Sequence, residues 1–317
     1  MKKLLITVNS VLLATAMTAC SDPVELTASH AKELNLSPDQ HRLRTQADPA
    51  VVALVPPEVR ADGKLTVGAL VQSAPPLHMR ATDNSTPIGS EVDLAQLVAD
   101  KMGLQLDYHE TSWDSWPLKV DSGEYELMHA NIAVLPARLE KFDITTYRAA
   151  YLGFVKAESN KGLNIQSPDD ISGLDVACGA GTNQERILLQ WNDKLVKEGK
   201  ELAHLKYFVN QTDSIMATLS GRIDAYLDTY PGASYTTETR DDLAIAGKIE
   251  AGWPAKTLVG AASKRGSGLA PAYAAAINSL REEGTYQEVL DHWGISEEAL
   301  PRSDIYSKEP YATGKLK

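Results

Sequence analysis

Short apolar blocks alternate with amphipathic blocks from residue 64 onward. One amphipathic block, 91–102, carries an apolar stripe at helical spacing and is followed by Gly103, a residue type that commonly ends a helix. Because strands that alternate with helices pair in parallel through right-handed crossovers, the stretch 64–151 is predicted to form one α/β unit. Its predicted elements are strands at 64–71, 105–110 and 127–130 and helices at 91–102 and 113–120.

A second alternation of the same kind covers 160–252 and predicts a second lobe. Its predicted elements are strands at 173–179, 205–209, 223–227 and 243–251 and helices at 185–198, 213–220 and 231–237. Two extended runs, 152–159 and 253–262, are predicted to be hinge strands between the lobes. The C-terminal helices are expected to return to the first unit, which makes lobe 1 64–151 plus 263–317. The predicted fold is α/β with two lobes, and a cleft of this kind is a favoured ligand site that closes by hinge motion.

Arg138 follows the predicted strand at 127–130 and stands two residues after Pro136, which suits the first turn of a helix. Ligands of open α/β sheets bind at the carboxyl ends of strands. A planar guanidinium at such an end suits a carboxylate. On spacing alone, the alternative for Arg138 is a solvated helix residue that pairs with an acid.

The composition is that of a soluble globular chain, with 43% hydrophobic and 23% charged residues among 317. A formal net charge of −11 argues against nucleic acid as a partner. The seven histidines form no cluster with metal-ligand spacing, and neither a metal nor a cofactor is expected. Cys178 lies in an apolar stretch and is expected to be a buried thiol rather than a nucleophile.

The N-terminus has the pattern of a secretory signal over 1–19, with two lysines ahead of an apolar stretch. The stretch ends in small residues before Cys20, which resembles a bacterial lipoprotein signal whose cysteine becomes the lipidated first residue. The alternative is an ordinary secretory signal with a cysteine there by chance. The next segment, 20–63, is charged, contains several prolines and has few aromatic residues, which favours a tether to the membrane. A docked N-terminal extension is the alternative for this segment.

Five segments, in order, resemble the extracytoplasmic substrate-binding proteins of ABC importers, in family 3, the branch for polar amino acids. They are 89–103 (GSEVDLAQLVADKMG), 122–145 (SGEYELMHANIAVLPARLEKFDIT), 179–185 (GAGTNQE), 220–231 (SGRIDAYLDTYP) and 281–294 (REEGTYQEVLDHWG). The resemblance covers 64–295 and implies a two-lobe, periplasmic-binding-protein-like fold of type II. It implies an extracytoplasmic, lipid-anchored monomer that binds a small polar carboxylate-bearing solute, in the first place an amino acid, and delivers it to an ABC transporter permease.

The resemblance also implies a ligand site. Arg138 falls on the arginine that clamps the ligand α-carboxylate in the family. The residues that fall on other ligand-contacting positions are Asn131, Ala133, Thr182, Asn183 and Trp113. A plain N-cap is the alternative for Thr182 and Asn183, and core packing is the alternative for Trp113.

The sequence departs from the family pattern on the ammonium side of the ligand. An acidic residue and an aromatic residue are common in the first loop of the family, whereas this chain has Leu70 and Ser73 near those places. The second-lobe aspartate that holds the ammonium is replaced by Thr229, and Asp228 stands one residue earlier. A slip of one residue turns a strand side chain to the other face. Ser73, Asp228 and Thr229 are therefore candidate ligand-binding residues, and the acceptor for the ammonium is left open.

An enzyme on the same scaffold is the competing hypothesis, since fold does not fix function. A cyclohexadienyl (prephenate or arogenate) dehydratase would need an acid or base in the cleft, for which the candidates are His129, Glu185 and Asp228. The sequence shows neither paired carboxylates at an informative spacing nor a G-x-S-x-G elbow, so an enzyme is not expected. A sensory or scaffold lobe is a third hypothesis, and no transmembrane or signalling segment supports it.

Overall fold

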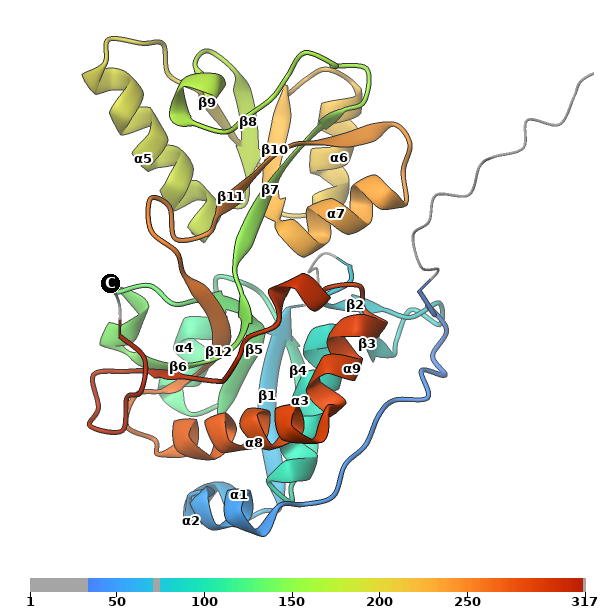
Figure 1. Ribbon diagram of the computed structural model, residues 1–317, viewed down its shortest axis with the longest axis vertical. Coiled ribbons are helices and arrows are strands. Elements are labelled where there is room, and N and C mark those ends of the chain that lie inside the picture. Colours follow the sequence, from blue (N-terminus) through green and yellow to red (C-terminus); the bar gives the residue numbers. More distant parts are fainter. Residues whose placement is uncertain (1–33, 71–74, 316–317) are drawn as a thin grey trace, which may run out of the picture.

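Two β-sheets, each with helices on its faces, form the two lobes of the computed structural model, which describes residues 34–70 and 75–315 (Figure 1). The first sheet has the strand order β13-β6-β12-β5-β1-β4. Its strands are β1 (Lys64–Leu70), β4 (Gln105–Thr111), β5 (Leu127–Ala133), β6 (Phe142–Ala149), β12 (Leu258–Lys264) and β13 (Ile305–Tyr306). As the strand and helix alternation predicts, β1 pairs in parallel with both β4 and β5. A separate ribbon pairs β2 (Met79–Arg80) with β3 (Pro87–Ile88).

The second sheet has the order β11-β7-β10-β8-β9. Its strands are β7 (Tyr151–Ala157), β8 (Asp175–Cys178), β9 (His204–Tyr207), β10 (Ala225–Thr229) and β11 (Leu243–Glu250). The strands β9, β8 and β10 pair in parallel. At the other edge, β7 pairs antiparallel with β10, and β11 pairs antiparallel with β7. The elements that complete this lobe are η2 (Pro168–Ile171), α5 (Asn183–Lys197), α6 (Gln211–Leu219) and α7 (Tyr230–Glu238).

Within residues 34–70 and 75–315, the chain crosses between the lobes twice, at Ala150 and at 251–257. These crossings touch, because the backbone N–H of Ala251 donates to the carbonyl of Ala150 at 3.1 Å. The sequence predicts hinge strands at 152–159 and 253–262, whereas β7 pairs only within the second sheet and β12 only within the first. Paired strands have their backbone groups satisfied within one sheet, so the short segments between them are left to form the hinge.

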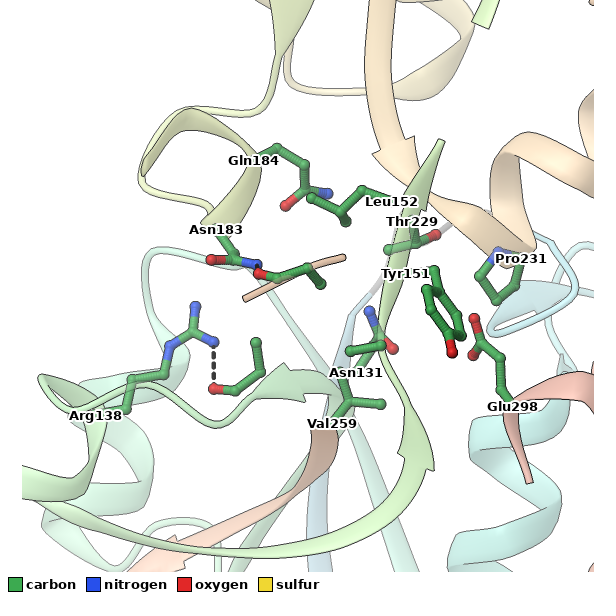
Figure 2. A pocket seen from close by; sticks show the side chains of 13 residues that line it. Asn131, Arg138, Tyr151, Leu152, Asn183, Gln184, Thr229, Pro231, Val259 and Glu298 are labelled. Carbon is green, nitrogen blue, oxygen red and sulfur yellow. Dashed lines mark hydrogen bonds between the residues drawn. The ribbon is translucent and has the colours of Figure 1, made fainter. Parts of the chain in front are cut away.

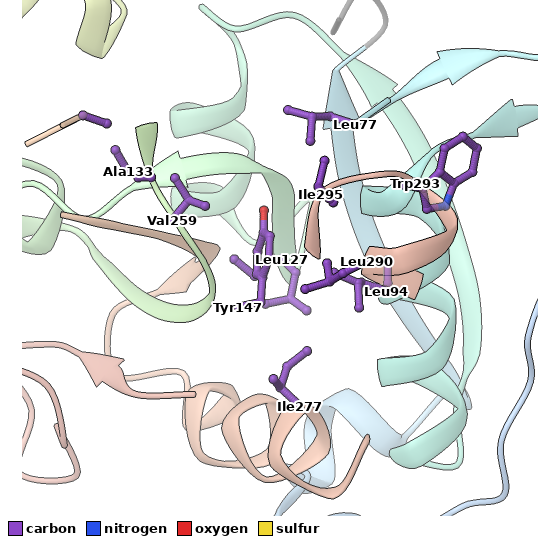
Figure 3. Packing of buried hydrophobic residues seen from close by; sticks show 14 of the residues in the cluster. Leu77, Leu94, Leu127, Ala133, Tyr147, Val259, Ile277, Leu290, Trp293 and Ile295 are labelled. Atoms are coloured by element: carbon purple, nitrogen blue, oxygen red, sulfur yellow. The ribbon is translucent and has the colours of Figure 1, made fainter. Parts of the chain in front are cut away.

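The C-terminal helices return to the first lobe, where they pack beside α3 (Ser90–Lys101). The elements of this return are α8 (Leu269–Glu283), α9 (Thr285–His292) and η3 (Ser296–Glu298). Figure 3 shows Leu94 of α3, Ile277 of α8 and Leu290 of α9 around Leu127 and Tyr147 of the sheet, and all five are buried. This packing brings the end of η3 close to the lobe boundary. Among the described helices, none is both long and apolar enough to cross a membrane.

The segment after Arg138 differs from the expected helix. Pro136 leads only into a single turn, η1 (Arg138–Glu140), and β6 follows at once. Phe142 to Arg148 are buried along the strand, and their β-branched and aromatic side chains fit a central strand better than a helix. The predicted helix start is therefore wrong. The helix predicted at 113–120 is present as α4 (Trp116–Ser122).

Residues 34–63 form an extension that is docked on the first lobe, contrary to the tether expected there. Its helices α1 (Pro49–Leu54) and α2 (Pro57–Arg60) bury Val51 and Val59. The Arg44 guanidinium makes a two-pronged hydrogen bond to the carboxylate of Asp100, with both distances 2.7 Å. Apolar burial and a bidentate ion pair hold this part of the chain against the lobe, which is the alternative that the sequence left open.

Candidate functional site

A pocket lies between the lobes, beside the two crossings (Figure 2). The first lobe contributes side chains from β5, η1, β12 and η3, and the second contributes the start of α5 and the junction of β10 with α7. Tyr151 and Leu152 at the start of β7 form the wall between them. The polar residues that line it are Asn131, Arg138, Asn183, Gln184, Thr229 and Glu298.

Arg138 is a cation without an acidic partner at this pocket. Its Nη1 donates to the carbonyl of Ala133 at 2.9 Å, and its guanidinium carbon lies 5.3 Å from the centre of the Trp113 ring. Within the described chain, no carboxylate lies within 4 Å of its nitrogens. Burial, together with the charge of nearby Arg186, lowers the pKa of Arg138 to about 10. A half-buried, unpaired guanidinium with free donors suits an anionic ligand group.

The start of α5 faces the same pocket from the second lobe. Thr182 is its N-cap, since its hydroxyl accepts the N–H of Glu185 at 3.3 Å and donates to the carbonyl of Gly179 at 2.7 Å. Gly181 has a φ of +68°, in the left-handed region that favours glycine, and this allows the tight turn into the helix. The N–H groups of the first helical turn and the positive end of the helix dipole favour an anion here.

Asn183 lines the pocket, but its side chain is already hydrogen-bonded to other groups of the protein. Its Nδ2 donates to the carbonyl of Ala251 in the second crossing, and its Oδ1 accepts from Nε of Arg186 at 2.9 Å. Thr182 is not among the residues that line the pocket. The contribution of these two residues to a ligand would therefore come from their backbone, while their side chains fix the helix start and the crossing.

Asn131 and Ala133 both line the pocket. Asn131 has a φ of +55°, an uncommon conformation for a non-glycine residue that is held by its neighbours. Its N–H donates to the hydroxyl of Tyr147 at 2.9 Å, and its Oδ1 accepts from Nη2 of Arg148 at 2.7 Å. The carbonyl of Ala133 accepts from Arg138, so this residue positions the guanidinium.

Trp113 connects the lobes at one side of the cleft. Its Nε1 donates to the carbonyl of Gly181 at 3.1 Å, across the lobe boundary. The guanidinium of Arg138 lies over the face of the same ring, at cation–π distance. Trp113 is not among the pocket-lining residues, so in this structure it orders Arg138 and the lobe contact.

The two second-lobe candidates, Thr229 and Asp228, differ in whether they line the pocket. Thr229 lines the pocket and caps α7, accepting the N–H of Gly232 at 3.4 Å. Asp228 does not line it: Gln211 donates to one of its oxygens at 3.0 Å, and burial raises its pKa. The opposite orientation of neighbouring strand residues explains the difference. Ser73 lies outside the described residues.

The family is decided by the sequence comparison. A model of the bacterial extracellular solute-binding proteins of family 3 matches residues 65–296, most of the chain and both lobes. The chain belongs to this family.

Curated relatives and a solved structure agree with this assignment. The L-cystine-binding protein TcyJ of Escherichia coli (strain K12) is 26% identical over 239 residues, which are 74% of this chain and 84% of TcyJ. The arginine-binding protein ArgT of Corynebacterium glutamicum is 26% identical over 264 residues, 83% of this chain and 84% of ArgT. The structure of AbpA from Streptococcus pneumoniae, an amino acid ABC transporter substrate-binding protein bound to L-arginine, has a TM-score of 0.65 at 24% identity over 75% of this chain and 98% of AbpA, so the fold is shared.

The residues considered for catalysis lie outside the pocket of this solute-binding protein. His129 is buried, with Nδ1 2.7 Å from a Glu91 oxygen and Nε2 2.6 Å from the hydroxyl of Tyr273. Glu185 accepts the N–H of Gly181 at 2.6 Å. Cys178 is a buried free thiol, as expected, and burial raises its pKa to about 12. The described part of the chain contains no cluster of His, Cys, Asp and Glu that could hold a metal ion.

The sequence did not point to Tyr151, Gln184 or Glu298 at the pocket. Tyr151 and Gln184 are adjacent to predicted features, the end of the first unit and Asn183, so their positions could have been found. Glu298 carries no such signal, because it is one of several acids near the C-terminus and reaches the cleft only through the packing of α9 and η3.

Proposed function

We propose that this protein binds a zwitterionic amino acid in the cleft between its lobes and delivers it to the permease of an ABC importer. The observation that carries the proposal is the unpaired guanidinium of Arg138, which faces the start of α5 across the pocket. An α-carboxylate between them would contact both lobes and stabilise the closed form by population shift. The names of the relatives, which bind L-cystine or arginine, support an amino acid as the ligand class.

Titration calorimetry with the twenty protein L-amino acids and L-cystine tests the proposal. At least one of them is expected to bind, and at a concentration about 100 times its Kd it should stabilise the protein by about 2.7 kcal/mol. The matched control is the amine that lacks only the carboxylate, such as agmatine for L-arginine, and it is expected to bind at least about 30-fold more weakly because the charged hydrogen bonds to Arg138 are lost. Equal binding of acid and amine would show that the pocket does not recognise a carboxylate.

We further propose that Cys20, which lies outside the described residues, is lipidated and anchors the protein to the membrane. The support is the lipoprotein-like signal at its N-terminus. In detergent phase partitioning, the full-length chain made in bacteria is expected in the detergent phase and the Cys20→Ser variant in the aqueous phase. Cys178→Ser, at a buried thiol, is the control and should partition as the wild type does. A Cys20→Ser variant that stays in the detergent phase would rule out this anchor.

A further inference from the structure

Glu298 is a buried carboxylate at the edge of the pocket (Figure 2). Within the described chain, only one of its two oxygens has a hydrogen-bond partner. The residue is 1% exposed, and its Oε2 accepts a hydrogen bond from Nη1 of Arg148. Its Oε1 is also buried, and no group in the described part of the chain bonds to it. An unpaired oxygen of a buried carboxylate is costly, which indicates that this atom has a partner when the protein works.

The neighbouring charges leave Glu298 only partly compensated. Arg148 also donates from Nη2 to Glu91, at 2.9 Å, so one guanidinium serves two carboxylates. Glu91 is fully buried, yet its contacts with His129 and Arg148 hold its pKa at about 2, so it stays ionised and shares the charge of Arg148 with Glu298. Burial is the main cause that raises the pKa of Glu298 to about 7, against the attraction of Arg148. Glu298 thus retains capacity for a second cation.

The pocket has one acid and one base among its described lining residues, Glu298 and Arg138. Thr229 contributes only a neutral hydroxyl to the lining, and Asp228 is bonded to Gln211 and does not line the pocket. A cleft with a single unpaired cation and a single half-paired carboxylate is complementary to a ligand that carries both charges.

We propose that Oε1 of Glu298 accepts hydrogen bonds from a cationic nitrogen of the bound amino acid, which makes this carboxylate the cation subsite of the cleft. The inference rests on the proposed amino acid ligand. It assigns the subsite to the C-terminal segment of the first lobe instead of the second-lobe strand end, so the first lobe holds both charged ends of the ligand and the second lobe closes over them.

A dependence of affinity on pH follows from this assignment. The charged or titratable groups that face Glu298 are Arg148 from β6, Lys248 from β11, Glu297 beside it in η3, Tyr286 from α9 and, through Arg148, Glu91 from α3. With a pKa of about 7 the free carboxyl is largely protonated at low pH, and a ligand cation requires the anion. Binding therefore releases a proton, and affinity rises through neutral pH until the carboxyl is fully ionised.

The experiment compares wild type, Glu298→Gln and a matched control, Glu297→Gln. Glu297 is the adjacent acid, but it is exposed, pairs with Lys248 at 3.0 Å and does not line the pocket. The probes are the twenty protein L-amino acids and L-cystine, screened by thermal shift at pH 8. Those that bind are then titrated by calorimetry at pH 6 and pH 8 in buffers of different ionisation enthalpy, which counts the protons released.

For wild type, we expect affinity to rise about tenfold from pH 6 to pH 8, with release of nearly one proton at pH 6 that falls to near zero at pH 8. Glu297→Gln should show the same rise with its midpoint at slightly lower pH, because the charge of Glu297 contributes to the raised pKa of Glu298. Glu298→Gln should bind at least about tenfold more weakly at pH 8, with no proton release and no pH slope. A Glu298→Gln variant that binds as the wild type does would overturn the subsite while leaving the amino acid function standing. If no probe shifts the wild type, the proposed function fails and the subsite with it. Unfolding of Glu298→Gln is checked by its own melting curve without ligand.

Discussion

Replacing Arg138 with alanine is expected to weaken binding of the cleft ligand by about 2–4 kcal/mol, which is roughly a 30- to 1000-fold increase in Kd. The loss is large because this guanidinium is half-buried and has no carboxylate partner within the described chain, so its charge is available to the ligand. Calorimetry with the best-binding amino acid from the panel measures the effect. Arg138→Lys should fall between wild type and alanine, because it keeps the charge but loses the planar fork and the contact with Trp113.

Arg240→Ala is the matched control for this prediction. Arg240 is an exposed arginine of the second lobe that pairs with Asp242 at 2.8 Å, so its loss should change the Kd by less than about twofold. Melting curves of Arg138→Ala check that the loop held by the bond to the Ala133 carbonyl has kept its fold. If Arg138→Ala and Arg240→Ala bind alike, Arg138 does not contact the ligand and another group must hold the carboxylate.

Arg138 also lies in the contact between the lobes. The Trp113 ring that packs on it donates to the carbonyl of Gly181, in the turn that precedes α5. A ligand carboxylate between Arg138 and the start of α5 would touch both of them. It would thereby also affect the hydrogen bond that Trp113 makes to Gly181. The two crossings at Ala150 and 251–257 are short and hydrogen-bonded to each other, so they can act as one hinge. Binding at this place would therefore be coupled to closure through the same few residues.

The sequence was sufficient for the parallel parts of both sheets, because the parallel strands other than β5 each lead into an α-helix before the next strand of their sheet. Among the antiparallel strands, β7, β11 and β12 correspond to predicted extended runs, whereas β6 does not. The strand β6 lies directly after a proline and a single helical turn, and its burial over Phe142 to Arg148 depends on β12, more than a hundred residues later. Local pattern cannot supply such a partner, and for this reason a helix was expected where a strand occurs.

The distinction between local sequence pattern and contacts distant in sequence also applies to the site. Arg138, Asn131 and Ala133, which the sequence predicts from one local motif at the end of β5, all line the pocket. The orientation of Thr229 relative to Asp228 depends on strand register, which one residue of slip reverses. Glu298 was missed because its position depends on an ion pair with Arg148, 150 residues away in sequence. Residues that act through tertiary contacts of this kind leave no local signal.

Arg148→Met is expected to destabilise the protein by about 3–5 kcal/mol at pH 8, since it leaves two buried carboxylates without their shared cation. Arg148, Glu91 and Glu298 are all 0–1% exposed. In the wild type, Glu91 has a folded pKa of about 2, below its ordinary 4.5, so its stabilising contribution is present above 4.5 and is lost only as pH falls through 2. Without Arg148, burial raises the pKa of both acids, and folding of the variant then takes up protons. The deficit relative to wild type should therefore be larger at pH 8 than at pH 5.5, as measured by urea denaturation at both values.

The double variant Arg148→Met/Glu298→Gln distinguishes an orphaned charge from a simple loss of packing. It removes one of the two carboxylates that lose Arg148, the one with no other hydrogen-bond partner in the described chain, so it should recover at least about 1 kcal/mol at pH 8 and show a smaller dependence on pH than Arg148→Met. The control is Arg302→Met, at an exposed arginine that pairs with Asp304 at 2.7 Å, and its stability should stay within about 0.5 kcal/mol of wild type. If the double variant is no more stable than Arg148→Met, the destabilisation comes from the lost packing of the Arg148 side chain and not from the charges. The account of Glu298 as a carboxylate only partly compensated by Arg148 would then be wrong.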